Sequence, residues 1–163
     1  MTPPQPTRVL FVCLGNICRS PAAEGVFLHQ LALEQLQDHF LVDSAGTGGW
    51  HRGHPPDERM QAAAARRGIQ LTSRARQIQL ADISSFDHIL TMDEDNLAQV
   101  RALSQRVQSG SQRARITPLT RFCRQRKAAA VPDPYYGGPE GFEQVLDLLE
   151  DACAGLLEAL RPR

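Results

Sequence analysis

The sequence lacks the features that would place the protein in a membrane, outside the cell or on nucleic acid. Its apolar run near the N-terminus is far too short for a signal peptide or a membrane span. Four cysteines among 163 residues argue against the disulfide framework of a small secreted domain. The 18 acidic and 18 basic side chains cancel, so no general affinity for nucleic acid or membranes is expected. We therefore expect a cytoplasmic protein that binds neither.

Internal repeats, low-complexity domains and interdomain linkers are also missing from the sequence. A chain of this length with 42% apolar residues can bury one substantial core. Residues 1–7 are rich in proline and predict a flexible tail, and residues 8–163 predict a single domain.

Apolar runs alternate with amphipathic segments along this domain. The pattern predicts strands at 8–13, 40–44, 86–92 and 115–119. It predicts helices at 20–38, 57–67, 95–105 and 141–160. Strand–helix alternation with right-handed crossovers gives a parallel sheet that is covered on both faces. The expected fold class is therefore α/β: a single-domain, three-layer α/β/α structure with a central four-stranded parallel sheet.

The most informative segment is the run Cys-Leu-Gly-Asn-Ile-Cys-Arg-Ser from Cys13 to Ser20. It lies between the first expected strand and the first expected helix, at the carboxyl end of that strand. A short loop in this place aims backbone N–H groups and the positive end of a helix at one point. The segment therefore predicts a phosphate-binding loop directly after the first strand.

The residue types in this loop suit chemistry on a bound phosphoryl group. Oriented amides, a helix N-terminus and a nearby cation favour a thiolate at Cys13, which could attack phosphorus. Arg19 can bind two phosphoryl oxygens, and the Ser20 hydroxyl could hydrogen-bond the sulfur and help it leave. Gly15 would let the loop take positive φ, and Asn16 is the next most tolerant residue. The alternative is a buried structural cysteine on an ordinary strand–helix turn.

A thiolate attack on a phosphate ester also needs an acid that protonates the departing oxygen. Asp133 is the best candidate, because the prolines on either side hold it in a stiff, extended loop. The adjacent Tyr135 and Tyr136 offer flat faces on which an aromatic substrate could stack. The alternative is a surface turn with two half-exposed tyrosines.

These motifs resemble those of the low-molecular-weight protein tyrosine phosphatase family. Four stretches carry the resemblance, in the order of the family: 9–21, Asp43-Ser44-Ala45-Gly46-Thr47, Ala75-Arg76-Gln77-Ile78 and Asp133-Pro134-Tyr135. The first is highly specific, and the overall length agrees as well. The resemblance implies that the protein hydrolyses phosphotyrosine, and small aryl phosphates, through a cysteinyl-phosphate intermediate.

The resemblance also implies roles for individual residues. Cys13 would be the nucleophile, Arg19 the phosphate binder and Asp133 the general acid and then base. The phosphate-binding loop would comprise Leu14, Gly15, Asn16, Ile17, Cys18 and Ser20. The slot for the phosphotyrosyl ring would be lined by Trp50, Tyr135 and Tyr136, with Ile17 at its lip.

The support of the loop departs from the family pattern at one position. The resemblance implies that Asn16 organises the loop and that Ser20 is the partner of the thiolate. Ser73 stands where some relatives place a histidine behind the loop. Ser44 is then the residue available to support Asn16.

Other activities are compatible with the same fold. An arsenate reductase needs further cysteines to relay a disulfide, and their usual place here reads Thr91-Met92-Asp93-Glu94. Relatives that act on phosphoarginine tend to carry threonine at the position of Ile17, whose branched side chain favours a flat ring. A module that binds phosphotyrosine without cleaving it is a third alternative, against which Cys13 and Asp133 argue.

We expect no cofactor and no metal, and phosphotyrosine-containing proteins are the expected partners. The protein is expected to be a monomer with at most weak self-association. Cys13 and Cys18 are close enough in the loop to pair on oxidation, and the resemblance supports a protective disulfide of this kind. Otherwise Cys18 simply packs in the first helical turn. Cys123 and Cys153 are expected to be structural.

Two further features lie outside these motifs. The segment from Arg101 to Lys127 carries eight basic residues and no acidic one. A solvated charged face is the plainer interpretation, and a docking surface for an acidic partner or phosphoprotein is the alternative. His51 and His54 lie close together near Trp50, but their spacing favours a solvated loop over a metal site.

Overall fold

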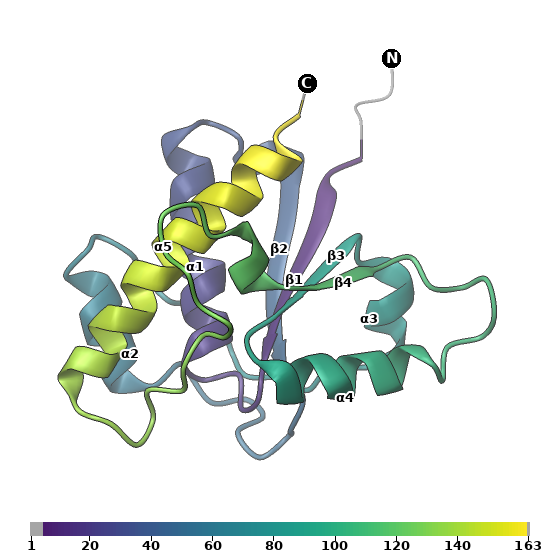
Figure 1. Ribbon diagram of the computed structural model, residues 1–163, viewed down its shortest axis with the longest axis horizontal. Helices are drawn as coiled ribbons and strands as arrows, with labels where there is room; N and C mark the ends of the chain where they lie inside the picture. Colours follow the sequence, from purple (N-terminus) through teal and green to yellow (C-terminus); the bar gives the residue numbers. More distant parts are fainter. Residues whose placement is uncertain (1–4, 163) are drawn as a thin grey trace.

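A computed structural model of the protein describes residues 5–162, and Figure 1 shows its four-stranded parallel sheet between two layers of helices. The strands are β1 (Thr7–Cys13), β2 (Phe40–Gly46), β3 (His88–Thr91) and β4 (Arg115–Pro118), in the spatial order β2-β1-β3-β4. The helices are α1 (Arg19–Leu33), α2 (Glu58–Ala65), α3 (Leu80–Ser85), α4 (Glu94–Ser104) and α5 (Pro139–Leu160). Two short 3-10 helices span Gln37–His39 and Leu119–Phe122.

The central strand β1 contributes to the core on both faces of the sheet. Val9 and Phe11 pack in a cluster with residues of α1, α2 and α5. Leu10 and Val12 pack in a second cluster with residues of α3 and α4. All four side chains are buried, which explains why β1 has a continuous apolar sequence and not an alternating one. The two clusters confirm the predicted three-layer α/β/α fold.

The last helix, α5, fixes the segment that leads to the predicted acid. A Cβ at Gly155 would collide with the carbonyl oxygen of Phe122, so the 3-10 helix lies directly against α5. Farther along, the Val131 N–H donates to the carbonyl of Met92 at 2.7 Å, and the Val131 side chain is buried. The chain is therefore anchored next to the end of β3, two residues before Asp133.

Several predicted boundaries differ from the structure. Helix α1 ends at Leu33 and not at residue 38, because Gln35 takes a left-handed φ of 57° that a helix cannot contain. Helix α3 was not predicted, since six residues are too few to show helical periodicity. Strand β1 begins at Thr7, so the last residue of the expected tail belongs to the sheet, and residues 1–4 lie outside the described residues.

None of the helices within residues 5–162 is long and apolar enough to cross a membrane.

Candidate active site

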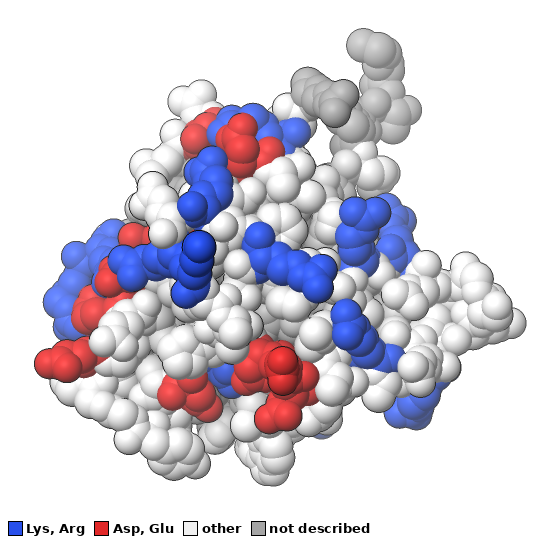
Figure 2. All heavy atoms as spheres, viewed as in Figure 1, with Lys and Arg blue, Asp and Glu red and all other residues white. Residues whose placement is uncertain are grey.

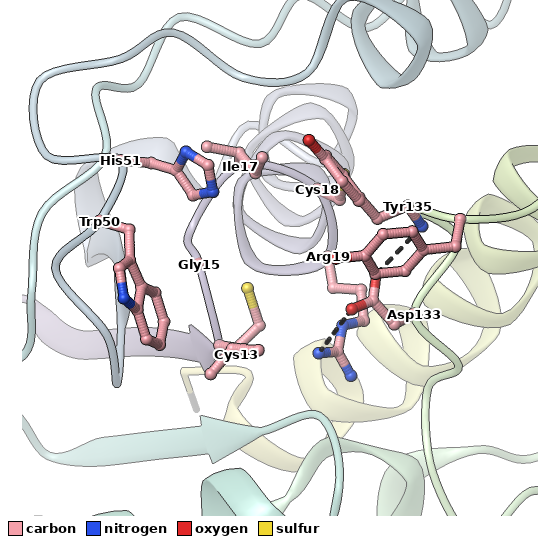
Figure 3. Close-up of a pocket in the computed structure, with 11 residues that line it drawn as sticks. Cys13, Gly15, Ile17, Cys18, Arg19, Trp50, His51, Asp133 and Tyr135 are labelled. Carbon is pink, nitrogen blue, oxygen red and sulfur yellow. Dashed lines mark hydrogen bonds and ion pairs between the residues drawn. The ribbon is translucent and has the colours of Figure 1, made fainter.

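A pocket of about 450 Å³ lies at the carboxyl end of β1. Its lining brings together residues from three distant stretches: Cys13, Leu14, Gly15, Ile17, Cys18, Arg19, Trp50, His51, Asp133, Tyr135 and Tyr136. Figure 3 shows the Cys13 sulfur pointing into the pocket, with Trp50 on one side and Tyr135 on the other. The nucleophile, cation, acid and aromatic side chains predicted from the sequence thus surround one cavity.

The backbone carbonyl groups of the loop after β1 accept hydrogen bonds from neighbouring segments of the chain. The carbonyls of Cys13, Leu14 and Ile17 accept from Thr47, Gly48 and Asp57 at 2.8–2.9 Å. Among the loop, turn and cap hydrogen bonds of residues 5–162, none starts at an N–H of residues 14–18. Helix α1, which follows, has no side-chain cap and no acid in its first turn. The loop therefore keeps several amide donors available for an anion.

Asn16 holds the loop in its conformation. It adopts a φ of 56°, and its Oδ1 accepts from the backbone N–H of Arg76 at 3.0 Å. Its Nδ2 donates to Ser20 Oγ at 2.7 Å and to Ser44 Oγ at 3.0 Å. The hydrogen bonds of Asn16 within the described residues involve these three partners and not Ser73.

The expectation for Gly15 was wrong, because its φ is not positive. Its missing side chain serves another purpose: a Cβ there would lie 3.0 Å from Cδ2 of His51. His51 belongs to the pocket lining, and the sequence had singled it out only as a weak metal candidate. No group of three potential metal-ligating side chains occurs in the part of the chain that the structure describes.

Cys13 is buried, with 3% of its surface exposed, and its sulfur lies 3.0 Å from Ser20 Oγ. This contact agrees with the hydroxyl–sulfur hydrogen bond expected from the sequence. Cys18 lines the same pocket, and burial raises the pKa of its thiol, with Asp57 adding to the effect. Cys18 is therefore a neutral thiol at physiological pH. All four cysteines are free thiols, and Cys123 and Cys153 are not among the residues that line this pocket.

Arg19 is 3% exposed and is oriented by partners that the sequence did not reveal. Its Nη1 donates to Asp93 Oδ2 at 2.6 Å and to the carbonyl of Val131 at 3.1 Å. Its Nη2 lies 3.8 Å from Asp133 Oδ2. The available signal for Asp93 was a carboxylate two residues after the end of β3, because the ends of parallel strands meet at one edge of the sheet.

Asp133 and the aromatic residues form the outer part of the pocket. The Asp133 side chain is 42% exposed, and its Oδ1 accepts from the Tyr135 N–H at 3.1 Å. The rings of Tyr135 and Tyr136 meet edge to face, with centroids 4.9 Å apart. Trp50 is 70% exposed and Tyr136 is 92% exposed, so flat apolar surface is available at the mouth.

Glu24 lies behind the loop and was not predicted from the sequence. The Ser44 hydroxyl donates to Glu24 Oε1 at 2.6 Å. Burial raises the pKa of Glu24 to about 7, against the hydrogen bond from Ser44, which lowers it. The neighbouring Asp43 adds to the rise and Arg76 opposes it.

The basic segment from Arg101 to Lys127 is partly neutralised within the molecule. Arg113 pairs with Asp87 at 2.7 Å, and Arg126 lies 3.9 Å from Asp147. Three consecutive backbone N–H groups, at 124–126, donate to the carboxylate of Asp151. Figure 2 shows basic side chains distributed across this face, with acidic ones among them on the side of α5. These contacts favour a solvated charged face.

A thiol at the floor of an amide-lined loop, with an arginine and a carboxylic acid beside it, defines the class of cysteine-dependent phosphatases. The family model described as low molecular weight phosphotyrosine protein phosphatase matches residues 8–163. The chain therefore belongs to this family and is a protein-tyrosine phosphatase by family, as the sequence motifs predicted.

Individual relatives agree with this assignment. The low molecular weight phosphotyrosine protein phosphatase of Homo sapiens is 43% identical over 150 residues, which are 92% of this chain and 93% of that protein. A crystal structure of a protein tyrosine phosphatase from Entamoeba histolytica has a TM-score of 0.88 at 41% identity, covering 94% of this chain and 96% of that one. DARP, a Drosophila arginine phosphatase, also has a TM-score of 0.88, at 31% identity and with 94% and 98% covered.

The role of Asp93 can be tested with Asp93→Asn. Asp93 Oδ1 also accepts from the Asn96 N–H at 2.8 Å and so caps α4, a task that asparagine performs equally well. The substitution removes the ion pair with Arg19, so we expect kcat/KM for p-nitrophenyl phosphate to fall about tenfold. The melting temperature should fall as well, because the buried Arg19 loses its charged partner. Asp95→Asn removes the same charge from an exposed site on α4 and should leave kcat/KM unaltered; an equal loss in both variants would contradict the anchoring role.

Proposed function

We propose that the protein hydrolyses phosphotyrosine in proteins, and small aryl phosphates, through a phosphate ester formed on Cys13. The observation that carries the proposal is the position of the Cys13 sulfur at the floor of a loop whose N–H groups lack acceptors within the described chain. Residues 8–163 would form the catalytic domain. The family and the named relatives support the same chemistry.

In the first step the Cys13 thiolate attacks phosphorus, and an S–P bond forms as the P–O bond to the phenol breaks. The loop amides and the Arg19 guanidinium hold the phosphoryl oxygens and stabilise their charge in the transition state. Asp133 donates its proton to the departing phenolic oxygen. Its side chain is 42% exposed and lines the same pocket as Cys13, beside Arg19, which suits this role.

In the second step a water molecule attacks the phosphorus of the cysteinyl phosphate. Asp133, now a carboxylate, accepts a proton from this water, and inorganic phosphate is released. The S–P bond breaks and returns the electron pair to sulfur. The Ser20 hydroxyl, 3.0 Å from that sulfur, supports the leaving thiolate.

The pocket walls favour a flat aromatic substrate. Tyr135 and Trp50 offer faces on opposite sides of the pocket, as Figure 3 shows, and Ile17 adds a half-buried apolar wall packed against the core. The likeness to DARP keeps phosphoarginine as a second candidate substrate. A competition between phosphotyrosine and phosphoarginine peptides of one sequence distinguishes them, and we expect a higher kcat/KM for phosphotyrosine.

An arsenate reductase activity has less support. It needs a relay of cysteines, and Cys18 is the one other cysteine of residues 5–162 that lines the pocket with Cys13. We also propose that the protein is a cytoplasmic monomer. The reducing conditions of the cytoplasm keep Cys13 in the reduced form that the reaction needs.

Rapid quenching with a radiolabelled aryl phosphate tests the proposed mechanism. We expect label on the peptide that contains Cys13, because the second step then begins from a covalent intermediate. Cys13→Ser should bind inorganic phosphate yet acquire no label, since the loop does not ionise a hydroxyl. Label on any other residue, or turnover by Cys13→Ser, would rule out this mechanism.

Asp133→Ala should slow phosphoenzyme formation to a degree that depends on the leaving group. Esters of weakly acidic alcohols need the proton most, so their rate should fall by about a hundredfold or more. Esters of acidic phenols should lose much less. Burst kinetics over a series of aryl and alkyl phosphates measure the effect, and an equal loss across the series would exclude Asp133 as the acid.

We further propose that Cys18 protects Cys13 from oxidation. Peroxide converts the Cys13 thiolate to a sulfenic acid, with an S–O bond formed and hydroxide released. The Cys18 sulfur then attacks that sulfur, so an S–S bond forms and the hydroxyl leaves as water with the Cys18 proton. Because burial raises the pKa of the Cys18 thiol, disulfide formation should become faster as the pH rises.

This redox role predicts that Cys18→Ser recovers less activity than the wild type when peroxide-treated protein is given a thiol. Without a partner thiol, Cys13 proceeds to irreversible sulfinic acid. Cys123→Ser serves as the control, because Cys123 lies outside the pocket lining, and it should recover like the wild type. Equal recovery in Cys18→Ser and the control would remove the protective role.

A further inference from the structure

We propose that Glu24 is a positioning residue, whose carboxylate directs the hydrogen bonds that run through Ser44, Asn16 and Ser20 to the Cys13 sulfur. The inference rests on the proposed function, since it concerns the reactivity of Cys13. Glu24 lies on α1, one turn after Ser20, and does not line the pocket. It would therefore act on Cys13 only through the intervening groups.

The groups form a continuous chain of hydrogen bonds. Glu24 Oε1 accepts from Ser44 Oγ at 2.6 Å, and Ser44 Oγ accepts from Asn16 Nδ2 at 3.0 Å. The same amide nitrogen donates to Ser20 Oγ at 2.7 Å. Ser20 Oγ lies 3.0 Å from Cys13 Sγ and 3.3 Å from the carbonyl of Ala45. Apart from Glu24, every side chain in this series of hydrogen bonds is buried.

The direction of donation along this chain is fixed. The backbone N–H of Arg76 can only donate, so it holds the Asn16 oxygen on its side and turns the amide nitrogen toward the serines. Both serine oxygens then accept from that nitrogen and must donate their own hydrogen elsewhere. Ser44 donates to Glu24, and Ser20 donates to the Cys13 sulfur or to the Ala45 carbonyl. A thiolate is the stronger acceptor of the two, because it is charged.

The carboxylate form of Glu24 is what preserves this direction. A protonated Glu24 is itself a donor, which competes with Asn16 for the lone pairs of Ser44 Oγ. The charged groups that act on Glu24 are Asp43 on β2 and Arg76 in the segment before α3. Arg76 is shared with Asp43 and Asp82, at 3.0 Å each, so it balances Glu24 only in part. With a pKa of about 7, Glu24 changes its charge in the physiological range.

The same shift affects stability, with a sign that can be worked out. The pKa of Glu24 rises from 4.5 to about 7 on folding, so between these values the folded state holds a proton that the unfolded state has lost. Stability therefore falls as pH rises through this window. Glu24→Gln carries no charge at any pH and should lack this part of the pH dependence.

The experiment compares Glu24→Gln, Glu24→Ala and the control Glu158→Gln, which removes a charge from an exposed site on α5. Glutamine keeps an acceptor oxygen for Ser44 but cannot ionise, and alanine removes the acceptor. The first readout is the pH profile of Cys13 alkylation by iodoacetate, which needs no turnover. The second is kcat and KM for p-nitrophenyl phosphate, and the third is the melting temperature at about pH 5 and about pH 8.

We expect the alkylation profiles of the wild type and Glu158→Gln to show an inflection near pH 7, which Glu24→Gln lacks. Glu24→Ala should lose about tenfold in kcat, with KM little changed, because the phosphate-binding groups are untouched. Glu24→Gln should keep kcat within about twofold of the wild type and gain melting temperature mainly at the higher pH. An inflection that persists in Glu24→Gln, or an equal kcat loss in Gln and Ala, would overturn the proposal.

A double mutant keeps the proposal testable if Glu24→Ala folds poorly. If Glu24 acts through Ser44, replacing Glu24 by glutamine or alanine in a Ser44→Ala background should cost no further kcat. Additive losses would show that Glu24 acts by another route. If the proposed function is wrong, the wild type will not turn over the aryl phosphate. The alkylation profile would still report on the hydrogen bonds between Glu24 and Cys13, because it needs no turnover.

Discussion

The arrangement of backbone amides after β1 is the constraint on which the site depends. The carbonyls of this loop accept from Thr47, Gly48 and Asp57, while the N–H groups of residues 14–18 meet no acceptor within the described chain. Such donors are costly to leave unpaired, which supports the anion binding that we propose for this loop. The sheet holds the loop at one end and α1 holds it at the other. Because the donors are fixed before any anion arrives, little reorganisation is needed when charge develops.

Two acidic side chains near the loop, Asp93 and Glu24, contact the groups that hold its conformation and its cation. Arg19 is buried and would be costly without a partner, and Asp93 supplies one while leaving the other guanidinium nitrogens for the pocket. Glu24 is a second acid behind the loop and does not line the pocket. Arg76 compensates the negative charge of Glu24 only in part. The raised pKa of Glu24 thus marks one ionisable group whose charged form reduces stability, a feature typical of functional sites.

The sequence predicted those parts of the site that depend on neighbours along the chain. The loop from Cys13 to Ser20 lies between a strand and a helix, so its anion-binding character follows from local structure alone. Asp93 and Arg19 are 74 residues apart and meet only because β3 lies beside β1, an order that strand–helix alternation does not specify. Glu24 reaches the site through Ser44 on the neighbouring strand, which is equally invisible to periodicity. The end of α1 at Leu33 depends on the left-handed φ of Gln35, a residue other than glycine, which propensity does not predict.

The contact between Arg19 and Val131 has a consequence for the geometry of the reaction. We propose that the Arg19 guanidinium binds the phosphoryl oxygens. It also donates to the carbonyl of Val131, which lies two residues before Asp133. A guanidinium is a rigid plane, so its donors cannot shift independently of one another. In the proposed mechanism, a tilt of the phosphoryl group would therefore be transmitted through Arg19 to Val131, two residues before Asp133. One planar cation would then serve as a common reference frame that aligns the in-line axis of the proposed displacement with the path of the proton.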